Sequence, residues 1–458
     1  MKIMKFMIFF FLFLVVACGR ASNDTYAEEI HDILEETPYH TPEEIPCYIP
    51  HNAIEPYKPL RYDVFSSGST RGEYLDDLDF LYATLRENFP FFDTILRSYG
   101  VDMHVRYMNT REHIESRNDF PSDMHFAATL NNFFLVEARG VGHMSSILDS
   151  DILLANIQLY RQLIEQGLTY LQPFLDEFNN SATRSLYDLT DMNFILPDNA
   201  ENIMHATTSN NIHTYIIEEG RIAYVNILEM NFFTMELDRI TLLDFFYQVA
   251  DYDHLVIDIR QNRGGFSSYF QDLVIAPNIS YPLRFENYVF FMGGEHNRRL
   301  LAHLFDKVDG IRPVNHDVIA HMTYFHHEAM NMLSYYYRLG FYIEPSYDTG
   351  IFNGKIWLLV GSQNVSGAEV AVAVAKQTGF ATLVGHQTGG GGMINHPLAE
   401  TFFVALPNTG IIVRYVAGYR VDDYGRENYE HGTQPHHFNR QGMDALETVL
   451  VMIDEGNY

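Results

Sequence analysis

The chain has 458 residues, and its 59 acidic side chains against 30 basic ones give a formal net charge of −29. A field this negative repels phosphates, so the charge argues against a nucleic-acid partner. Hydrophobic residues make up 47% of the chain and charged residues 19%, which excludes a disordered protein and a membrane protein with many spans. The only cysteines, Cys18 and Cys47, exclude a disulfide framework and a cysteine-based zinc site. A globular protein of two or three domains remains, at about 150 residues per domain.

The N-terminus has the features of a secretory signal. Lys2 and Lys5 precede an apolar run over 6–16, which is shorter than the ~20 residues of a membrane-spanning helix. The run ends in Val-Val-Ala-Cys, which resembles a bacterial lipobox with Cys18 as the acylated first residue of the mature protein. The alternative is an ordinary signal peptide that ends near a cysteine. We therefore predict a lipoprotein signal peptide over 1–17 and a lipid-anchored protein of the cell envelope, outside the cytoplasm.

A tether and a helical domain are predicted next. Residues 18–62 carry six prolines among acidic residues, which is typical of a semi-rigid tether. Thr70 and Glu73 have the spacing of a capping box, and apolar residues at helical intervals follow. Residues 63–145 are thus predicted to form a helical N-terminal domain, with helices over 73–88, 102–116 and 122–140.

The remainder of the chain predicts an α/β core. Residues 146–219 form a connecting region that is helical over 152–178, polar over 179–215, and without a recognisable PDZ motif. From residue 220 on, strands and helices alternate, which indicates an α/β layer, and residues 295–350 interrupt the pattern as a candidate lid. Strands are expected over 222–228, 254–259, 286–292, 355–360 and 380–385, helices over 234–250, 267–275, 367–378 and 443–453, and a hairpin over 400–416.

A serine lies at one of these strand-to-helix turns. The strand over 355–360 runs through Gly361-Ser362-Gln363-Asn364-Val365 into Ser366 and then an apolar helix. Free backbone N–H groups and the positive end of the helix dipole meet at such a place, and they favour a developing oxyanion. The alternative is structural, because Ser366 and Glu369 also have capping-box spacing.

Two glycine-rich segments follow other strands. The strand ending in Asp258-Ile259-Arg260 breaks into Gly264-Gly265, and these glycines could bring a second N–H to the same oxyanion or simply form a tight turn. Gly385-His386-Gln387-Thr388 is followed by four glycines, but no Lys-Ser/Thr follows them, so the segment is no phosphate-binding P-loop.

Taken in order, these segments resemble the tail-specific (carboxy-terminal-processing) serine protease family. The family's D-[LI]-R-x-N-x-G-G strand motif is similar to residues 258–265, and its nucleophile motif is similar to residues 362–369. The resemblance implies a ClpP/crotonase-like α/β core over 220–458 and a nucleophile at Ser366. It also implies oxyanion donors from Gly367 and from Gly264 or Gly265.

One departure from the family's larger branch bears on the mechanism. That branch uses a Ser/Lys dyad, and the position of its lysine is occupied here by Gly391, which cannot accept a proton. The other branch, similar to the tricorn core protease, uses a histidine after the N-terminal helical domain, and Gly-His-Met-Ser at His143 resembles that element. The resemblance makes His143 the general base and Glu430, or else Glu427, the acid that orients it.

The resulting hypothesis is a serine peptidase that hydrolyses proteins or peptides outside the cytoplasm. It needs no cofactor and no metal, and the histidine pairs at 326–327 and 436–437 are interpreted as loop residues because no metal-ligand spacing supports them. Two alternatives stay open. One is a catalytically inactive surface lipoprotein that binds peptides with the protease fold, and the other is an esterase with the same triad.

Overall fold

A computed structural model describes residues 68–456 with gaps at 118–119, 121, 149, 166, 190–208, 306–309, 348–349 and 393–400. The predicted signal peptide, Cys18, the whole predicted tether over 18–62 and the first five residues of the predicted helical domain lie outside the described residues. Within the described ranges, no helix has both the length and the hydropathy needed to cross a membrane.

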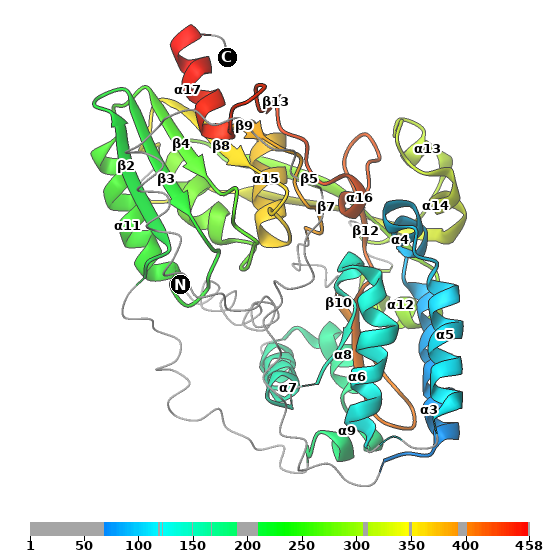
Figure 1. Cartoon of the computed structure of the whole chain (residues 1–458). Coiled ribbons are helices and arrows are strands. Elements are labelled where there is room, and N and C mark those ends of the chain that lie inside the picture. Colours follow the sequence, from blue (N-terminus) through cyan, green and yellow to red (C-terminus); the bar gives the residue numbers. More distant parts are fainter. Residues whose placement is uncertain are drawn as a thin grey trace.

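The helices before residue 190 form one part of the molecule, drawn in blue and cyan in Figure 1. The predicted capping box is present, because the Thr70 side chain accepts from Glu73 N while the Glu73 side chain accepts from Thr70 N. The sequence did not predict α4, since its eight residues are too few for a clear apolar period. The helices are α3 (Arg71–Asn88), α4 (Phe92–Tyr99), α5 (Met103–Ser116), α6 (Asp123–Phe133), α7 (Ser150–Glu165), α8 (Gln172–Glu177) and α9 (Ser181–Leu186).

A six-stranded sheet forms the other part, with the order β13-β9-β8-β4-β3-β2. Its strands are parallel except for β2, which pairs antiparallel with β3. The central strands are mostly apolar and are buried along nearly their whole length, because both faces of the sheet are covered. The strands are β2 (Ile212–Glu218), β3 (Ile222–Ile227), β4 (His254–Asp258), β8 (Lys355–Val360), β9 (Thr382–Gly385) and β13 (His437–Phe438).

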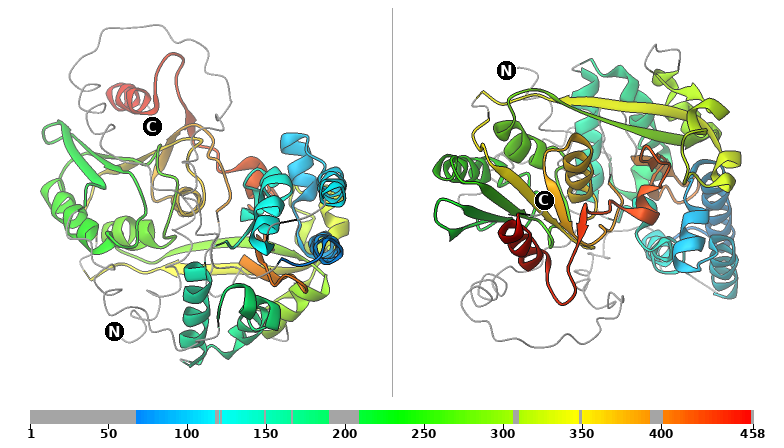
Figure 2. Two further views of the ribbon diagram at one scale, coloured as in Figure 1. Left: turned by 60° about the horizontal axis from the view of Figure 1, so that its bottom comes forward. Right: turned by 90° about the horizontal axis from the view of Figure 1, so that it is seen from above.

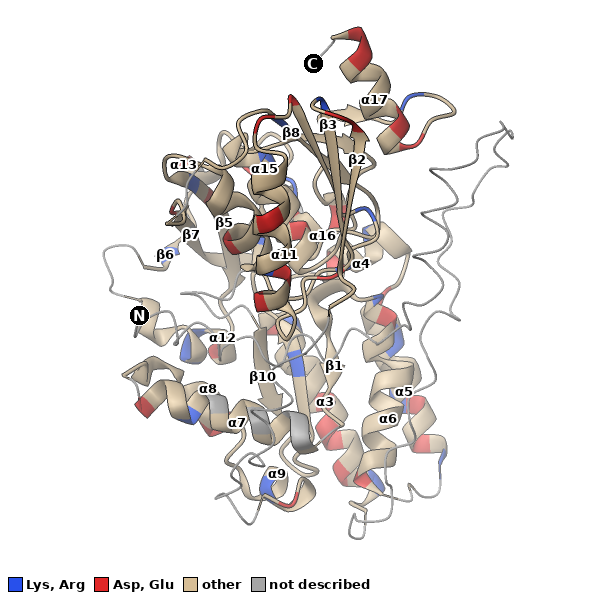
Figure 3. Ribbon diagram, turned by 90° about the vertical axis from the view of Figure 1, so that its left-hand side faces the viewer, with Lys and Arg blue, Asp and Glu red and all other residues tan. Residues whose placement is uncertain are grey.

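Three helices cover this sheet. Trp357 and Leu359 pack with α17 (Ala445–Glu455) on one face, whereas Leu358 belongs to the core shared with α11 (Met235–Gln248) and α15 (Gly367–Thr378). The alternation of neighbouring strand residues between the two faces explains this division. Acidic residues recur along α11 and α17 in Figure 3, with Glu236 and Glu447 in their first turns.

Two smaller sheets connect the parts. In the order β12-β5-β7-β6, β5 (Leu283–Met292) pairs with β7 (Leu333–Ile343), and Figure 2 shows this long pair running from the large sheet to the N-terminal helices. Residues 333–343 of the expected lid are therefore a strand of this sheet. The predicted hairpin is confirmed as β10 (Thr401–Ala405) and β11 (Ile412–Val416), and β1 (Ser145–Ser146) pairs with β11. The remaining elements are β6 (Arg312–Pro313), β12 (Tyr419–Val421), α12 (Glu295–Leu300), α13 (His316–Ile319), α14 (His327–Met332) and α16 (Asn428–His431).

A buried carboxylate joins the first helix to the β10–β11 turn. Asp77 on α3 is fully buried. It accepts hydrogen bonds from the backbone N–H groups of Asn408 and Thr409, both at 2.9 Å, and from the Thr409 hydroxyl at 2.6 Å. Burial raises the pKa of Asp77, and these hydrogen bonds oppose that rise. The contact links residues more than three hundred positions apart in the sequence.

We expect Asp77→Ala to lower the free energy of unfolding by about 3 kcal/mol, because it leaves several buried donors without an acceptor. Urea unfolding measures this change. Asp76→Ala is the matched control, since Asp76 is exposed on the same helix, and it should change stability by less than ~0.5 kcal/mol. Equal losses in the two variants would contradict the assigned role of Asp77.

Candidate functional site

Ser366 lies at the turn between β8 and α15, where the sequence left open a role as a helix cap. Its backbone has φ 53° and ψ −124°, and a positive φ is unusual for a residue with a side chain. Its hydroxyl makes no capping hydrogen bond. Glu369 completes no capping box either, because its Oε1 accepts from Asn428 Nδ2 and Thr433 Oγ1, each at 2.7 Å. The capping interpretation is therefore wrong.

The turn that carries Ser366 is fixed to the loop after β4. The buried Asn364 side chain donates to the carbonyl oxygens of Ile259 and Asn262. Ser366 N donates to Gly390 O at 3.3 Å, so the glycine run after β9 holds the other side of the turn. Three chain segments thus maintain the backbone conformation of Ser366 against its strain.

The three glycines that the sequence offered as oxyanion donors lie close together. Gly264 has φ 99°, and a Cβ atom there would lie 2.6 Å from Val365 O and 2.7 Å from Gly367 N. A Cβ atom on Gly367 would lie 2.5 Å from Gly265 O. These distances are shorter than van der Waals contact, so the two backbones approach this closely only because the residues are glycines.

The N–H groups of these glycines differ in what they bind. Gly264 N donates to Asn262 Oδ1 at 2.8 Å. The N–H groups of Gly265 and Gly367 have no acceptor within the described part of the chain. Gly367 N is one of the free donors in the first turn of α15. The arrangement favours Gly265 over Gly264 as the partner of Gly367.

His143 lies in the short turn η6 (Val141–His143) after the N-terminal helices. Its Nδ1 lies 2.7 Å from the hydroxyl of Tyr429, which belongs to α16. Gly142 precedes it with φ 68°, and a Cβ atom there would collide with the Phe89 ring. Burial lowers the pKa of His143 to about 4, and the nearby Arg414 contributes in the same direction. The imidazole is therefore neutral at pH 7 and can accept a proton.

Ser366 and His143 lie against neighbouring residues of the glycine run, Gly390 and Gly391 respectively. Gly390 O binds Ser366 N, and a Cβ atom on Gly391 would lie 3.6 Å from His143 Cε1. No hydrogen bond joins His143 to the Ser366 hydroxyl among the described residues. A Cβ atom on Gly391 would also lie 2.9 Å from the Tyr429 ring, and φ is 71° there. A lysine at position 391 thus has neither the space nor the backbone conformation it would need.

Neither candidate acid contacts His143. The Glu430 carboxylate lies 2.8 Å from Arg97 Nη2 and 3.2 Å from His326 Nε2. Glu427 is fully buried and accepts from Tyr429 N at 2.8 Å and Glu430 N at 2.9 Å. Burial raises the pKa of Glu427 to about 8, although both N–H groups oppose the rise. Glu427 thus caps α16, and the helix turns Glu430 away from the imidazole.

Residues 221–437 match the model of peptidase family S41. Residues 221–437 form an S41 peptidase core. No curated protein matches the chain. The Asp258–Gly265 motif and Ser366 both fall within the S41 core, and this family implies a serine-type peptidase, a hydrolase that binds proteins or peptides. His143 lies outside the matched residues.

Solved structures resemble the chain at low identity. Mature CPAF in complex with lactacystin is 14% identical, with 84% of this chain and 97% of that chain covered and a TM-score of 0.44. A lipoprotein from Streptococcus agalactiae is 11% identical over 86% of this chain and 99% of that chain, with a TM-score of 0.41. The photosystem II D1 C-terminal processing protease is 13% identical over 83% and 97% of the two chains, with a TM-score of 0.39.

Sequence reasoning missed two residues that support the S41 core. Tyr429 gave no signal because a tyrosine beside two candidate acids fits no motif, yet its hydroxyl is the partner of His143. Asn364 lies inside the nucleophile motif, and its buried side chain joins the turns after β4 and β8. Its place two residues before the serine could have indicated this role, because short polar side chains commonly bond to nearby turn backbone.

The burial of His143 predicts a pH dependence of stability. The pKa of His143 is about 4 in the folded chain, below the ordinary value of 6.5, so the unfolded chain takes up this proton first as the pH falls. Stability is therefore lost between about pH 6.5 and pH 4. We expect His143→Gln to lose less stability than the unmodified protein over this window, as measured by urea unfolding at several pH values.

His437→Gln, at an exposed position on β13, is the control for removing a histidine as such. It should follow the unmodified protein across the same pH series. Parallel stability curves for His143→Gln and the unmodified protein would show that the imidazole is not held neutral by burial.

Proposed function

We propose that this protein is a serine peptidase in which Ser366 is the nucleophile and His143 the general base. The observation that carries the proposal is the geometry of the Ser366 turn. The Ser366 backbone has a positive φ, and its hydroxyl makes no capping hydrogen bond. The residue lies beside the N–H groups of Gly265 and Gly367, which lack acceptors among the described residues. A serine on a strained turn, with free N–H donors beside it, is well placed to attack a carbonyl carbon and to have the resulting oxyanion stabilised.

The reaction proceeds by acyl transfer. Ser366 Oγ attacks the carbonyl carbon of a peptide bond while its proton passes to His143 Nε2, and the carbonyl oxygen becomes an oxyanion that accepts from the two glycine N–H groups. The C–N bond then breaks, and the leaving amine takes the proton from the imidazolium. Water repeats the sequence to release the acid and restore Ser366. Each N–H donor contributes roughly 10² to 10³ in rate.

Tyr429 sets the tautomer that this reaction needs. When His143 Nδ1–H donates to the Tyr429 hydroxyl, Nε2 keeps its lone pair and can take the serine proton. A neutral phenol stabilises the imidazolium less than a carboxylate would. Glu427 acts one step further away, because it accepts from Tyr429 N and so orients α16. Glu427 rather than Glu430 is therefore the acid that supports the base.

Substrate binding has to complete the arrangement. His143 and Ser366 contact adjacent residues of the glycine run without a mutual hydrogen bond, and such bonds often form only in the complex. We assign proteins or peptides outside the cytoplasm as substrates, with the enzyme anchored by lipid at Cys18. The predicted signal peptide supports this location.

A serine-directed fluorophosphonate should label Ser366, because labelling needs an activated hydroxyl beside oxyanion donors. Ser366→Ala should abolish both labelling, read by mass spectrometry, and hydrolysis of an unfolded protein, with little change in melting temperature. Ser362→Ala is the matched control, since Ser362 is exposed in the same motif, and it should keep both activities.

The same experiment separates the alternatives. An unlabelled Ser366 in the folded protein would favour the inactive peptide-binding lipoprotein and would overturn the proposal. Labelling with turnover of esters but not of peptides would identify an esterase that uses the same residues.

Tyr429→Phe tests the positioning role. The Phe91 ring, whose centroid lies 4.9 Å from that of Tyr429, can pack against phenylalanine as well. Loss of one neutral hydrogen bond of about 1 kcal/mol should lower kcat about three- to ten-fold with little change in KM. The acid limb of the pH–rate profile should also move to lower pH, because the imidazolium loses its acceptor.

Tyr424→Phe is the control, since Tyr424 is exposed on the loop before α16. It should leave kcat and the pH profile unchanged. An unchanged pH–rate profile in Tyr429→Phe would mean that the phenol does not tune His143.

A further inference from the structure

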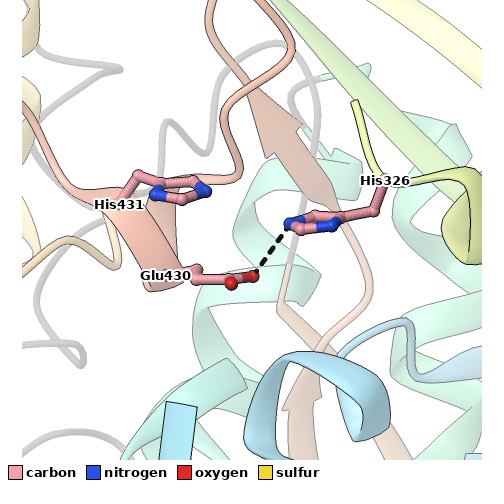
Figure 4. Close-up of side chains that lie close together, drawn as sticks. All are labelled: His326, Glu430 and His431. Carbon is pink, nitrogen blue, oxygen red and sulfur yellow. Dashed lines mark ion pairs between the residues drawn. The ribbon is translucent and has the colours of Figure 1, made fainter. Parts of the chain in front are cut away.

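Three potential metal ligands converge beside the candidate site of Ser366 and His143. Their ligand atoms, from His326, Glu430 and His431, all lie within 4.8 Å of one another. His326 directly precedes α14, whereas Glu430 and His431 end α16, so two segments about a hundred residues apart supply the group. Figure 4 shows the Glu430 carboxylate pointing toward the His326 ring with His431 beside it. The sequence interpretation of His326 as a loop histidine did not anticipate this cluster.

The spacing of one donor pair in the cluster matches that of a metal site. His326 Nε2 lies 3.2 Å from Glu430 Oε2, close to the edge of about 3.3 Å that bonds of 2.0–2.1 Å give in a tetrahedral site. His326 Nε2 is buried and makes no hydrogen bond to any of the described residues, so this contact does not have the directional geometry of one. The His326 and His431 rings are nearly parallel, at 8° between planes. Two imidazoles and one carboxylate are a donor set that zinc accepts with a position left open.

Arg97 binds the same carboxylate, and its positive charge is the main effect that opposes binding of a metal ion. Arg97 Nε donates to both oxygens of Glu430, at 3.3 and 3.1 Å, and Nη2 donates to Oε2 at 2.8 Å. A carboxylate offers about four lone-pair sites, so the guanidinium and a metal ion can share it. The guanidinium charge weakens the site, but it also fixes the carboxylate toward the histidines.

We propose that His326, Glu430 and His431 bind a divalent transition-metal ion of the zinc class. The ion connects the segment between β5 and β7 to α16, the helix that carries Tyr429. The site lies outside the acyl-transfer machinery and supplies no step of the proposed reaction. Its existence is therefore independent of whether Ser366 is a nucleophile.

Titration calorimetry of the full mature chain without a histidine tag, with zinc chloride, tests the proposal. We expect one binding event per chain that weakens at least ten-fold in His326→Gln and in His431→Gln. His321→Gln is the matched control, because His321 is an exposed histidine of the same segment, and it should bind zinc like the unmodified protein. Melting curves identify any variant that does not fold, and the other variant then decides.

Cobalt(II) gives a second measurement on the unmodified protein alone. A four- or five-coordinate site should produce visible absorption that saturates at one ion per chain and disappears when zinc is added. Absence of this absorption, or zinc binding that is unchanged in both folded histidine variants, would overturn the proposal and leave the cluster as an ion pair between His326 and Glu430.

Discussion

Contact between two backbone segments at one end of the large sheet controls the rest of the site. Strands β4 and β8 are parallel neighbours, so the loops that follow them leave the sheet side by side. Gly264 and Gly367 let these loops approach to distances at which a methyl group would overlap a carbonyl or an amide. The approach places beside Ser366 two N–H groups that have no acceptor among the described residues, and it holds Ser366 at a positive φ. A side chain at either glycine would push the two loops apart and move the N–H donors away from the Ser366 hydroxyl.

Helix α16 connects this turn to the N-terminal helices, although it has only four residues. Asn428 donates to the buried Glu369 and accepts from Gly392 N, while Tyr429 contacts His143. The buried Glu427 caps the helix and fixes the direction of both side chains. One short helix thus aligns the proposed base, which the N-terminal part of the chain supplies, with the proposed nucleophile.

Burial gives the proposed base its character. Removal from water keeps the imidazole neutral, and the same low dielectric strengthens the glycine N–H donors toward an oxyanion. Glu430, which is half-buried, keeps its charge because Arg97 and His326 lower its pKa against the effect of burial. Two glutamates three residues apart therefore serve different purposes, one as a buried cap and one in a cluster with histidines. Their environments decide this difference, since the residue type is the same.

The sequence alone determined the α/β core, the glycine motif and the position of Ser366, because apolar period and turn residues act over short distances. The existence of β3, β4, β8 and β9 follows from such local patterns, whereas their order in the sheet depends on pairing between distant segments. Only the tertiary structure decided that Ser366 caps nothing, that Tyr429 rather than Glu430 contacts His143, and that β7 pairs with β5. Each of these depends on the direction of a side chain or on a pairing between distant segments. Apolar periodicity predicts neither side-chain direction nor long-range pairing. In a helix as short as α16, a shift of one residue changes which side chain faces the imidazole of His143.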